Sequence, residues 1–92
     1  ALPISNHMPT VQIYTTRFCP YCVAAIRLLK KKNVKFDEIA VDGRPDLRAK
    51  MAKKSGATSV PQIWIGGQHI GGCDELYGLE SRGKLDQLLA DD

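Results

Sequence analysis

The feature that most restricts the fold of this chain is a strand pattern followed at once by a helix pattern and then by a second strand pattern. Residues 11–15 alternate apolar and polar side chains and are rich in β-branched and aromatic types, as strands are. Pro20 suits the first position of a helix, and Val23 and Leu29 belong to an apolar stripe with helical spacing. Residues 34–41 form the second strand pattern. Such a unit requires a parallel strand pair joined by a right-handed crossover.

Turn residues and helix-start residues divide the rest of the chain. Pro45 begins a second helix that Gly56 ends. A two-residue turn, Gly66-Gly67, joins two short strands into a hairpin. The remaining elements are predicted as a strand at 60–65, a strand at 68–70, a helix beginning at Cys73 and a helix at 81–89. The order β-α-β-α-β-β-α-α predicts an α/β fold, with a four-stranded mixed sheet and helices on both faces.

Length and composition limit the chain to one small domain. A chain of 92 residues has room for one hydrophobic core. No apolar run approaches the roughly 20 residues that a membrane-spanning helix needs, so no membrane partner is predicted. The formal net charge of +3 is too small to indicate a nucleic-acid partner, although it favours anionic small molecules.

The beginning of the chain and its cysteine content bear on where the protein works. No charged segment followed by an apolar one opens the sequence, so no secretory signal is predicted. Residues 1–7 lack periodicity and the pair His7-Met8 resembles a cloning junction, so residues 1–7 are expected to be a remnant and residues 8–92 the single domain. Three cysteines are too few for a secreted disulfide framework, which favours a reducing cytoplasm.

Two cysteines lie at the start of the first predicted helix. Cys19 falls at the N-cap, beside unpaired backbone N–H groups and the positive end of the helix dipole. Both features stabilise a thiolate, and Arg17 adds a positive charge nearby; cysteines at such positions commonly have a pKa of roughly 3.5–7.5 instead of about 8.5. Cys22 lies one turn deeper on the same face. Cys19 is therefore predicted to attack a disulfide and Cys22 to resolve it.

A pair of cysteines with this spacing also occurs as half of a structural zinc site. Such a site uses four ligands, commonly from two CxxC pairs. The other ligand candidates in this chain are a lone Cys73, His7 near the beginning of the chain and His69 in a strand. The sequence therefore favours a redox dithiol and predicts no metal site.

Three motifs follow one another in the order that one redox family shows. They are Cys19-Pro20-Tyr21-Cys22, then Ser59-Val60-Pro61, then Gly71-Gly72-Cys73-Asp74. Together they resemble the dithiol glutaredoxins of the thioredoxin superfamily, in particular the small bacterial members, over about residues 11–89. The Trp-Cys-Gly-Pro-Cys motif that is characteristic of thioredoxins is absent from the sequence. The resemblance implies a thioredoxin-like fold and a single glutaredoxin domain at residues 8–92.

The resemblance also implies a groove for glutathione beside Cys19. In the family the bond equivalent to Val60-Pro61 is cis and faces the active-site cysteine, and Ser59 belongs to the same motif. The backbone N–H and C=O of Val60 would pair with the cysteinyl part of the tripeptide, as an added strand does. The alternative is a proline that only begins a strand.

The γ-glutamyl end of glutathione would lie at the start of the third helix. The N–H groups of Cys73 and Asp74 would donate to its α-carboxylate, and the Asp74 carboxylate would pair with its α-ammonium. Gly72 would permit a close approach of the ligand. Alternatively, Asp74 only caps the helix.

Other residues near the motifs have two readings each. Many family members carry Lys three positions before the first cysteine, where this chain has Thr16. Arg17, one position later, is therefore the candidate partner of the glycyl carboxylate of glutathione. The alternative is that Arg17 is a solvated surface residue. Tyr21 is predicted to shield the sulfur or to line the groove. The Cys73 sulfur is expected to be a packed bystander and His69 a surface residue.

The predicted function is glutathione-dependent reduction of protein disulfides and glutathione mixed disulfides by a cytoplasmic monomer. Its partners would be glutathione, as a co-substrate, and glutathionylated or disulfide-containing proteins, with no tightly bound cofactor. Three alternatives stay open: a glutathione-ligated [2Fe–2S] cluster carrier, a thioredoxin-like reductant regenerated by a flavoenzyme, and a non-catalytic adaptor. Pro20-Tyr21 argues against the cluster carrier, because such carriers usually have Gly-Phe-Ser or a small residue within the motif.

Overall fold

The order of helices and strands is the one that the sequence predicts. The computed structural model describes residues 9–90, so the prediction for residues 1–7 lies outside the described residues. Within 9–90 the elements are β1 (Val11–Thr15), α1 (Pro20–Lys31), β2 (Asp37–Ala40), α2 (Pro45–Ser55), β3 (Gln62–Ile65), β4 (Gln68–Gly71), α3 (Cys73–Ser81) and α4 (Leu85–Ala90). In this part of the chain every helix is too short or too polar to reach across a bilayer.

The sheet is mixed and has the strand order β2-β1-β3-β4. β1 and β2 pair in parallel, with α1 as the crossover between them, and β1 pairs with β3 in the antiparallel direction. The Gly66-Gly67 turn joins β3 and β4 into an antiparallel hairpin, and both glycines have positive φ values, of 59° and 82°. The predicted four-stranded mixed sheet is thus confirmed.

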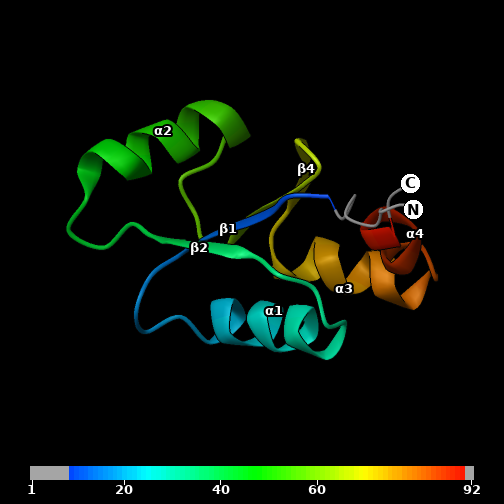
Figure 1. Ribbon diagram of the computed structural model, residues 1–92. Coiled ribbons are helices and arrows are strands. Elements are labelled where there is room, and N and C mark those ends of the chain that lie inside the picture. Colours follow the sequence, from blue (N-terminus) through cyan, green and yellow to red (C-terminus); the bar gives the residue numbers. More distant parts are fainter. Residues whose placement is uncertain (1–8, 91–92) are drawn as a thin grey trace, which may run out of the picture.

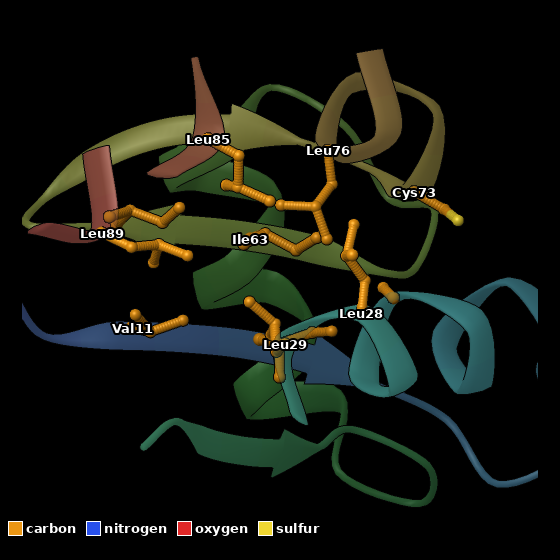
Figure 2. Close-up of a cluster of buried hydrophobic side chains, with 11 residues drawn as sticks. Val11, Leu28, Leu29, Ile63, Cys73, Leu76, Leu85 and Leu89 are labelled. Atoms are coloured by element: carbon orange, nitrogen blue, oxygen red, sulfur yellow. The ribbon is translucent and has the colours of Figure 1, made fainter. Parts of the chain in front are cut away.

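Helices cover both faces of the sheet (Figure 1). α1 and α3 lie on one side and α2 on the other. The larger buried cluster fills the space under α1, α3 and α4 and includes Ile13, Leu29, Ile63, Leu76 and Leu85, each with no exposed surface (Figure 2). Burying an aliphatic side chain of this kind contributes about 1.5–3 kcal/mol to folding, so this layer is the main source of stability.

A smaller cluster lies under α2. It consists of Tyr14, Val41, Met51 and Trp64, all at most 5% exposed. Side chains of a strand alternate between the two faces of the sheet. Tyr14 follows Ile13 in β1 and Trp64 follows Ile63 in β3, so both aromatic side chains lie on the face opposite the larger cluster. The expectation that Trp64 is a packing residue is confirmed.

The starts of α1 and α2 and the end of α2 lie where the sequence predicts them. α1 and α2 both begin at a proline, Pro20 and Pro45, whose missing N–H would be unpaired at that position anyway. Gly56 ends α2 with φ 79°, and Asn33 follows α1 with φ 60°. Both residues adopt the left-handed conformation that stops a right-handed helix.

Two strands are shorter than predicted. β2 does not include Val34 or Phe36, which are half-buried against the larger cluster instead of pairing with β1. Their apolar pattern therefore reflects packing of a loop, and the predicted strand at 34–41 is too long. β3 begins only after Pro61, which has no N–H to donate to a neighbouring strand.

The last helix begins later than predicted. α3 continues through Ser81, and α4 starts at Leu85 after a turn that contains Gly83 at φ 70°. A residue in this left-handed conformation cannot continue a right-handed helix. The helix predicted at 81–89 is therefore wrong in its first part, which belongs to α3 and the turn.

Candidate active site

Cys19 is the N-cap of α1. Its backbone is extended, with φ −127° and ψ 99°, and its sulfur accepts a hydrogen bond of 3.1 Å from the backbone N–H of Cys22. The first turn of α1 carries no acidic residue that would oppose the positive end of the helix dipole. The Cys19 side chain is partly accessible. An N–H donor and a helix N-terminus are both directed at the sulfur, which is the arrangement that stabilises a thiolate.

Cys22 lies in a different environment one turn along the same helix. It is only 2% exposed, and burial, together with the contact to the Cys19 side chain, raises its pKa to about 12. Cys22 is therefore a protonated thiol at neutral pH. The two cysteines of one motif thus differ in accessibility and in the surroundings of their sulfur atoms.

A small groove lies beside Cys19. It has a volume of about 160 Å³ and is lined by Tyr21, Ser59, Val60, Pro61, Gly72, Cys73, Asp74 and Glu75. The Cys19 thiol donates a long hydrogen bond, 3.9 Å, to the carbonyl oxygen of Val60, which connects the sulfur to this groove. The Val60-Pro61 peptide bond is cis, as the resemblance implies. The groove thus contains seven of the eight residues that the sequence proposes for glutathione binding.

The opposite wall of the groove is the N-terminus of α3. Gly72 is its N-cap, and the Gly72 N–H donates to the Glu75 carboxylate at 2.7 Å. A Cβ atom on Gly72 would lie 3.3 Å from the carbonyl oxygen of Pro61, so a larger residue here would crowd the other wall. Glu75 is not among the residues predicted from the sequence, although its position three residues after the N-cap is the spacing of a capping box.

Asp74 is exposed in the first turn of α3 and is not the N-cap. The alternative in which Asp74 only caps the helix is therefore wrong, since the capping carboxylate belongs to Glu75. The neighbouring Cys73 is 9% exposed, and burial, with the negative charge of Asp74, raises its pKa. Figure 2 shows the Cys73 sulfur at the edge of the larger cluster, directed away from the leucines.

Arg17 is the one candidate that the structure does not bring to the groove. Its backbone N–H donates to the Asp42 carboxylate at 2.8 Å, a bond that lowers the pKa of Asp42. Its guanidinium carbon lies 5.8 Å from the centre of the Phe18 ring. Arg17 lines a separate cavity of about 280 Å³ together with Cys22 and Asp42.

Three large apolar side chains beside the cysteines are exposed. Phe18 is 93% exposed, Tyr21 65% and Val23 50%. Phe18 is not among the residues predicted from the sequence, although an aromatic residue directly before the first cysteine was an available signal. Exposed apolar side chains gathered at one place commonly mark a surface that contacts another molecule.

The described residues contain no cluster of side chains suited to binding a metal ion. Within 9–90 no three His, Cys, Asp or Glu side chains are grouped so that they could hold a metal ion. All three cysteines are free thiols. Thiol chemistry at Cys19 is what the arrangement can perform.

Comparisons of the sequence and of the structure with known proteins all identify glutaredoxins as similar. The sequence model of the Glutaredoxin family matches residues 11–70. A glutaredoxin of Pseudomonas aeruginosa is 61% identical over 83 residues, which cover 90% of this chain and 99% of that protein. The solution structure of a glutaredoxin from Brucella melitensis is similar with a TM-score of 0.81 and 51% identity, over 91% of both chains. The crystal structure of a buckwheat glutaredoxin–glutathione complex has a TM-score of 0.82 at 28% identity, over 89% of this chain and 77% of that one.

Proposed function

The chain belongs to the glutaredoxin family, and from this premise we propose that Cys19 is the nucleophile and Cys22 the resolving thiol. The protein is a glutathione-dependent thiol–disulfide oxidoreductase. The observation that carries the assignment of roles is the asymmetry of the two thiols. Cys19 is accessible and receives an N–H bond, whereas Cys22 is buried and has a pKa of about 12.

The first reaction is removal of glutathione from a glutathionylated thiol. The Cys19 thiolate attacks the glutathione sulfur of the mixed disulfide, the S–S bond breaks, and the substrate leaves as a thiolate that takes up a proton. Cys19 then carries the glutathionyl group. A second glutathione thiolate attacks the sulfur of that group, which releases Cys19 as a thiolate and forms glutathione disulfide. Cys22 takes no part in this cycle.

The second reaction is reduction of a protein disulfide. Cys19 attacks one sulfur of the disulfide and forms a mixed disulfide, while the other sulfur leaves and is protonated. Cys22 then loses its proton and attacks the Cys19 sulfur, which releases the reduced substrate and forms a Cys19–Cys22 disulfide. Two glutathione molecules reduce this disulfide in turn. Because Cys22 holds its proton tightly, its attack is the step that we expect to be slow.

Glutathione would occupy the groove beside Cys19. Its cysteinyl part would pair with the backbone of Val60, and its α-carboxylate would accept from the N–H groups of Cys73 and Asp74. Asp74 is exposed and carries a carboxylate free to meet the α-ammonium group. Arg17 is left out of this site, because it does not line the groove and its guanidinium lies beside the Phe18 ring.

Protein substrates would be bound by the exposed side chains of Phe18, Tyr21 and Val23. These residues lie on either side of Cys19 in the sequence, so a protein that presents its disulfide to Cys19 would cover them. We place this activity in a monomer and in a reducing cytoplasm, and the small number of cysteines in the sequence supports the reducing compartment.

The alternative functions are less well supported. The family membership favours glutathione over a flavoenzyme as the source of electrons, and it favours catalysis over a purely adaptor role. Pro20 and Tyr21 fill the motif in which cluster carriers usually have smaller residues. A visible absorption spectrum of protein purified without oxygen tests the cluster carrier, which would absorb where a simple thiol protein does not.

The experiment that tests the proposed roles uses two variants and two substrates. Cys19→Ser and Cys22→Ser are assayed with a glutathionylated peptide and with a protein disulfide, with glutathione and its reductase as the electron supply. We expect Cys22→Ser to keep the first activity and lose the second, and Cys19→Ser to lose both. An active Cys19→Ser protein, or loss of both activities in Cys22→Ser, would contradict the assignment.

A further inference from the structure

Gln62 is a buried polar residue that the reaction described above does not use. It is the first residue of β3, follows Pro61 directly and is 5% exposed. Its amide nitrogen donates to the carbonyl oxygen of Ser59 at 3.1 Å and to the Ser59 hydroxyl at 3.3 Å. Its amide oxygen lies 2.7 Å from Nε2 of His69. A buried amide with all its bonds directed at one loop and one ring indicates a specific task.

The contact with Ser59 fixes the direction of a peptide group that faces the groove. The Ser59 carbonyl and the Val60 N–H belong to one planar trans peptide unit, in which they point in opposite directions. When Gln62 holds the carbonyl, the Val60 N–H must point away from the Gln62 side chain. Within residues 9–90 no acceptor pairs with this N–H. Gln62 therefore keeps a backbone donor unpaired and oriented beside the groove.

His69 fixes the orientation of the Gln62 amide. The Ser59 carbonyl accepts only, so the amide nitrogen must face it and the amide oxygen must face His69, whose Nε2 then carries the proton. The His69 ring is itself held in place, because it packs on Trp64 with ring centres 4.8 Å apart. Trp64 is buried and also contacts Lys54, whose nitrogen lies 4.6 Å from the ring centre. The expectation that His69 is a plain surface residue is thus incomplete: the residue is exposed, but its ring has two defined contacts.

We propose that Gln62, oriented by His69, is a positioning residue that presents the Val60 N–H to glutathione. This inference rests on the proposed function, since it concerns the same groove. It adds a residue that touches neither the ligand nor the reacting sulfur and acts through the Ser59–Val60 peptide. Loss of one such hydrogen bond should weaken glutathione binding about three- to tenfold. The rate of the chemical step at Cys19 should not change, because Gln62 does not contact the sulfur.

The test measures binding of S-methylglutathione, an analogue that cannot form a disulfide, by NMR titration of the reduced protein. Gln62→Leu removes the amide, Gln62→Glu keeps its size but cannot donate to the Ser59 carbonyl, and His69→Phe keeps a ring on Trp64 without the bond to Gln62. The matched control is Gln68→Leu, an exposed glutamine of β4 that takes no part in the hydrogen bonds joining Gln62 to Ser59 and His69. We expect Kd to rise about three- to tenfold in Gln62→Leu and Gln62→Glu, less in His69→Phe, and not in the control.

Two readouts separate the positioning role from a purely structural one. His69→Gln, which can still donate to the Gln62 amide oxygen, should recover binding relative to His69→Phe. The alkylation rate of Cys19 should equal the wild-type rate in every variant. If Gln62→Leu does not fold, the Kd values of Gln62→Glu, His69→Phe and His69→Gln test the positioning role by the same titration. Wild-type Kd in the folded Gln62 variants would overturn the inference, whereas a wild-type protein that does not bind S-methylglutathione would overturn the proposed groove itself.

Discussion

Cys22 should react with iodoacetamide far more slowly than an ordinary cysteine at pH 7. Its pKa is raised from 9.0 to about 12, chiefly by burial. The fraction present as thiolate at pH 7 then falls from about one in 100 to about one in 100,000, a factor of about 1,000. A thiolate of higher pKa is intrinsically more nucleophilic, which raises the alkylation rate per thiolate by a factor of about 20 over three pKa units. The net expectation is a rate about fiftyfold lower, before the 2% exposure of the side chain slows it further.

The assay is a time course of alkylation at pH 7, followed by digestion with trypsin. Cleavage after Arg17 and Arg27 gives a peptide that contains both Cys19 and Cys22, and its fragmentation in the mass spectrometer locates the label. Cys19 should be labelled first. Cys22 should be labelled at least about fifty times more slowly than the same residue in protein unfolded by urea. Equal rates for Cys22 in folded and unfolded protein would refute the argument that burial keeps this thiol protonated.

Three further predictions concern stability. Leu29→Ala, at a core position with no exposed surface, should lower the free energy of unfolding by about 2–5 kcal/mol in urea titrations; a loss below about 1 kcal/mol would contradict the assigned core. Gly71→Ala should cost roughly 1–3 kcal/mol in the same assay, because φ is 117° and the new Cβ would lie 2.9 Å from the Glu75 side chain; an unchanged midpoint would show that the position is unstrained. The raised pKa of Cys22 means that the folded protein keeps a proton that the unfolded chain loses, so stability should fall between pH 9 and pH 12 by up to about 1.4 kcal/mol per pH unit. Cys22→Ser should lose less stability over this range, and identical pH profiles for the two proteins would count against the shifted pKa.

The parts of the fold that depend on local rules could be predicted from the sequence. Pro20 determines where α1 begins, and this places Cys19 at the N-cap whatever the rest of the chain does. The Gly66-Gly67 turn determines the hairpin in the same way. Phe36 shows where such rules fail, because its apolar character serves packing against distant residues and not pairing in a strand.

The groove was predicted through a resemblance, and its details follow from contacts between distant segments. The cis bond at Val60-Pro61 has no local signal, since the trans form is the common one. Arg17 does not line the groove, and its place could not be predicted from spacing alone, because its loop is held by a bond from the Arg17 backbone N–H to Asp42, which is 25 residues away. Gln62 could not be singled out, because its two partners become neighbours only when β3 pairs with β4 and the preceding loop folds back.

The most direct test of the account is to find which sulfur receives the glutathionyl group. Cys22→Ser and Cys19→Ser proteins are each incubated with a glutathionylated peptide, quenched with acid and examined by mass spectrometry. We predict one glutathionyl group on Cys19 in the Cys22→Ser protein, with release of one equivalent of peptide thiol, and none on Cys22 in the Cys19→Ser protein. A glutathionyl group acquired equally fast by Cys22 when Cys19 is absent would contradict the claim that α1 and its buried second thiol make Cys19 the attacking group.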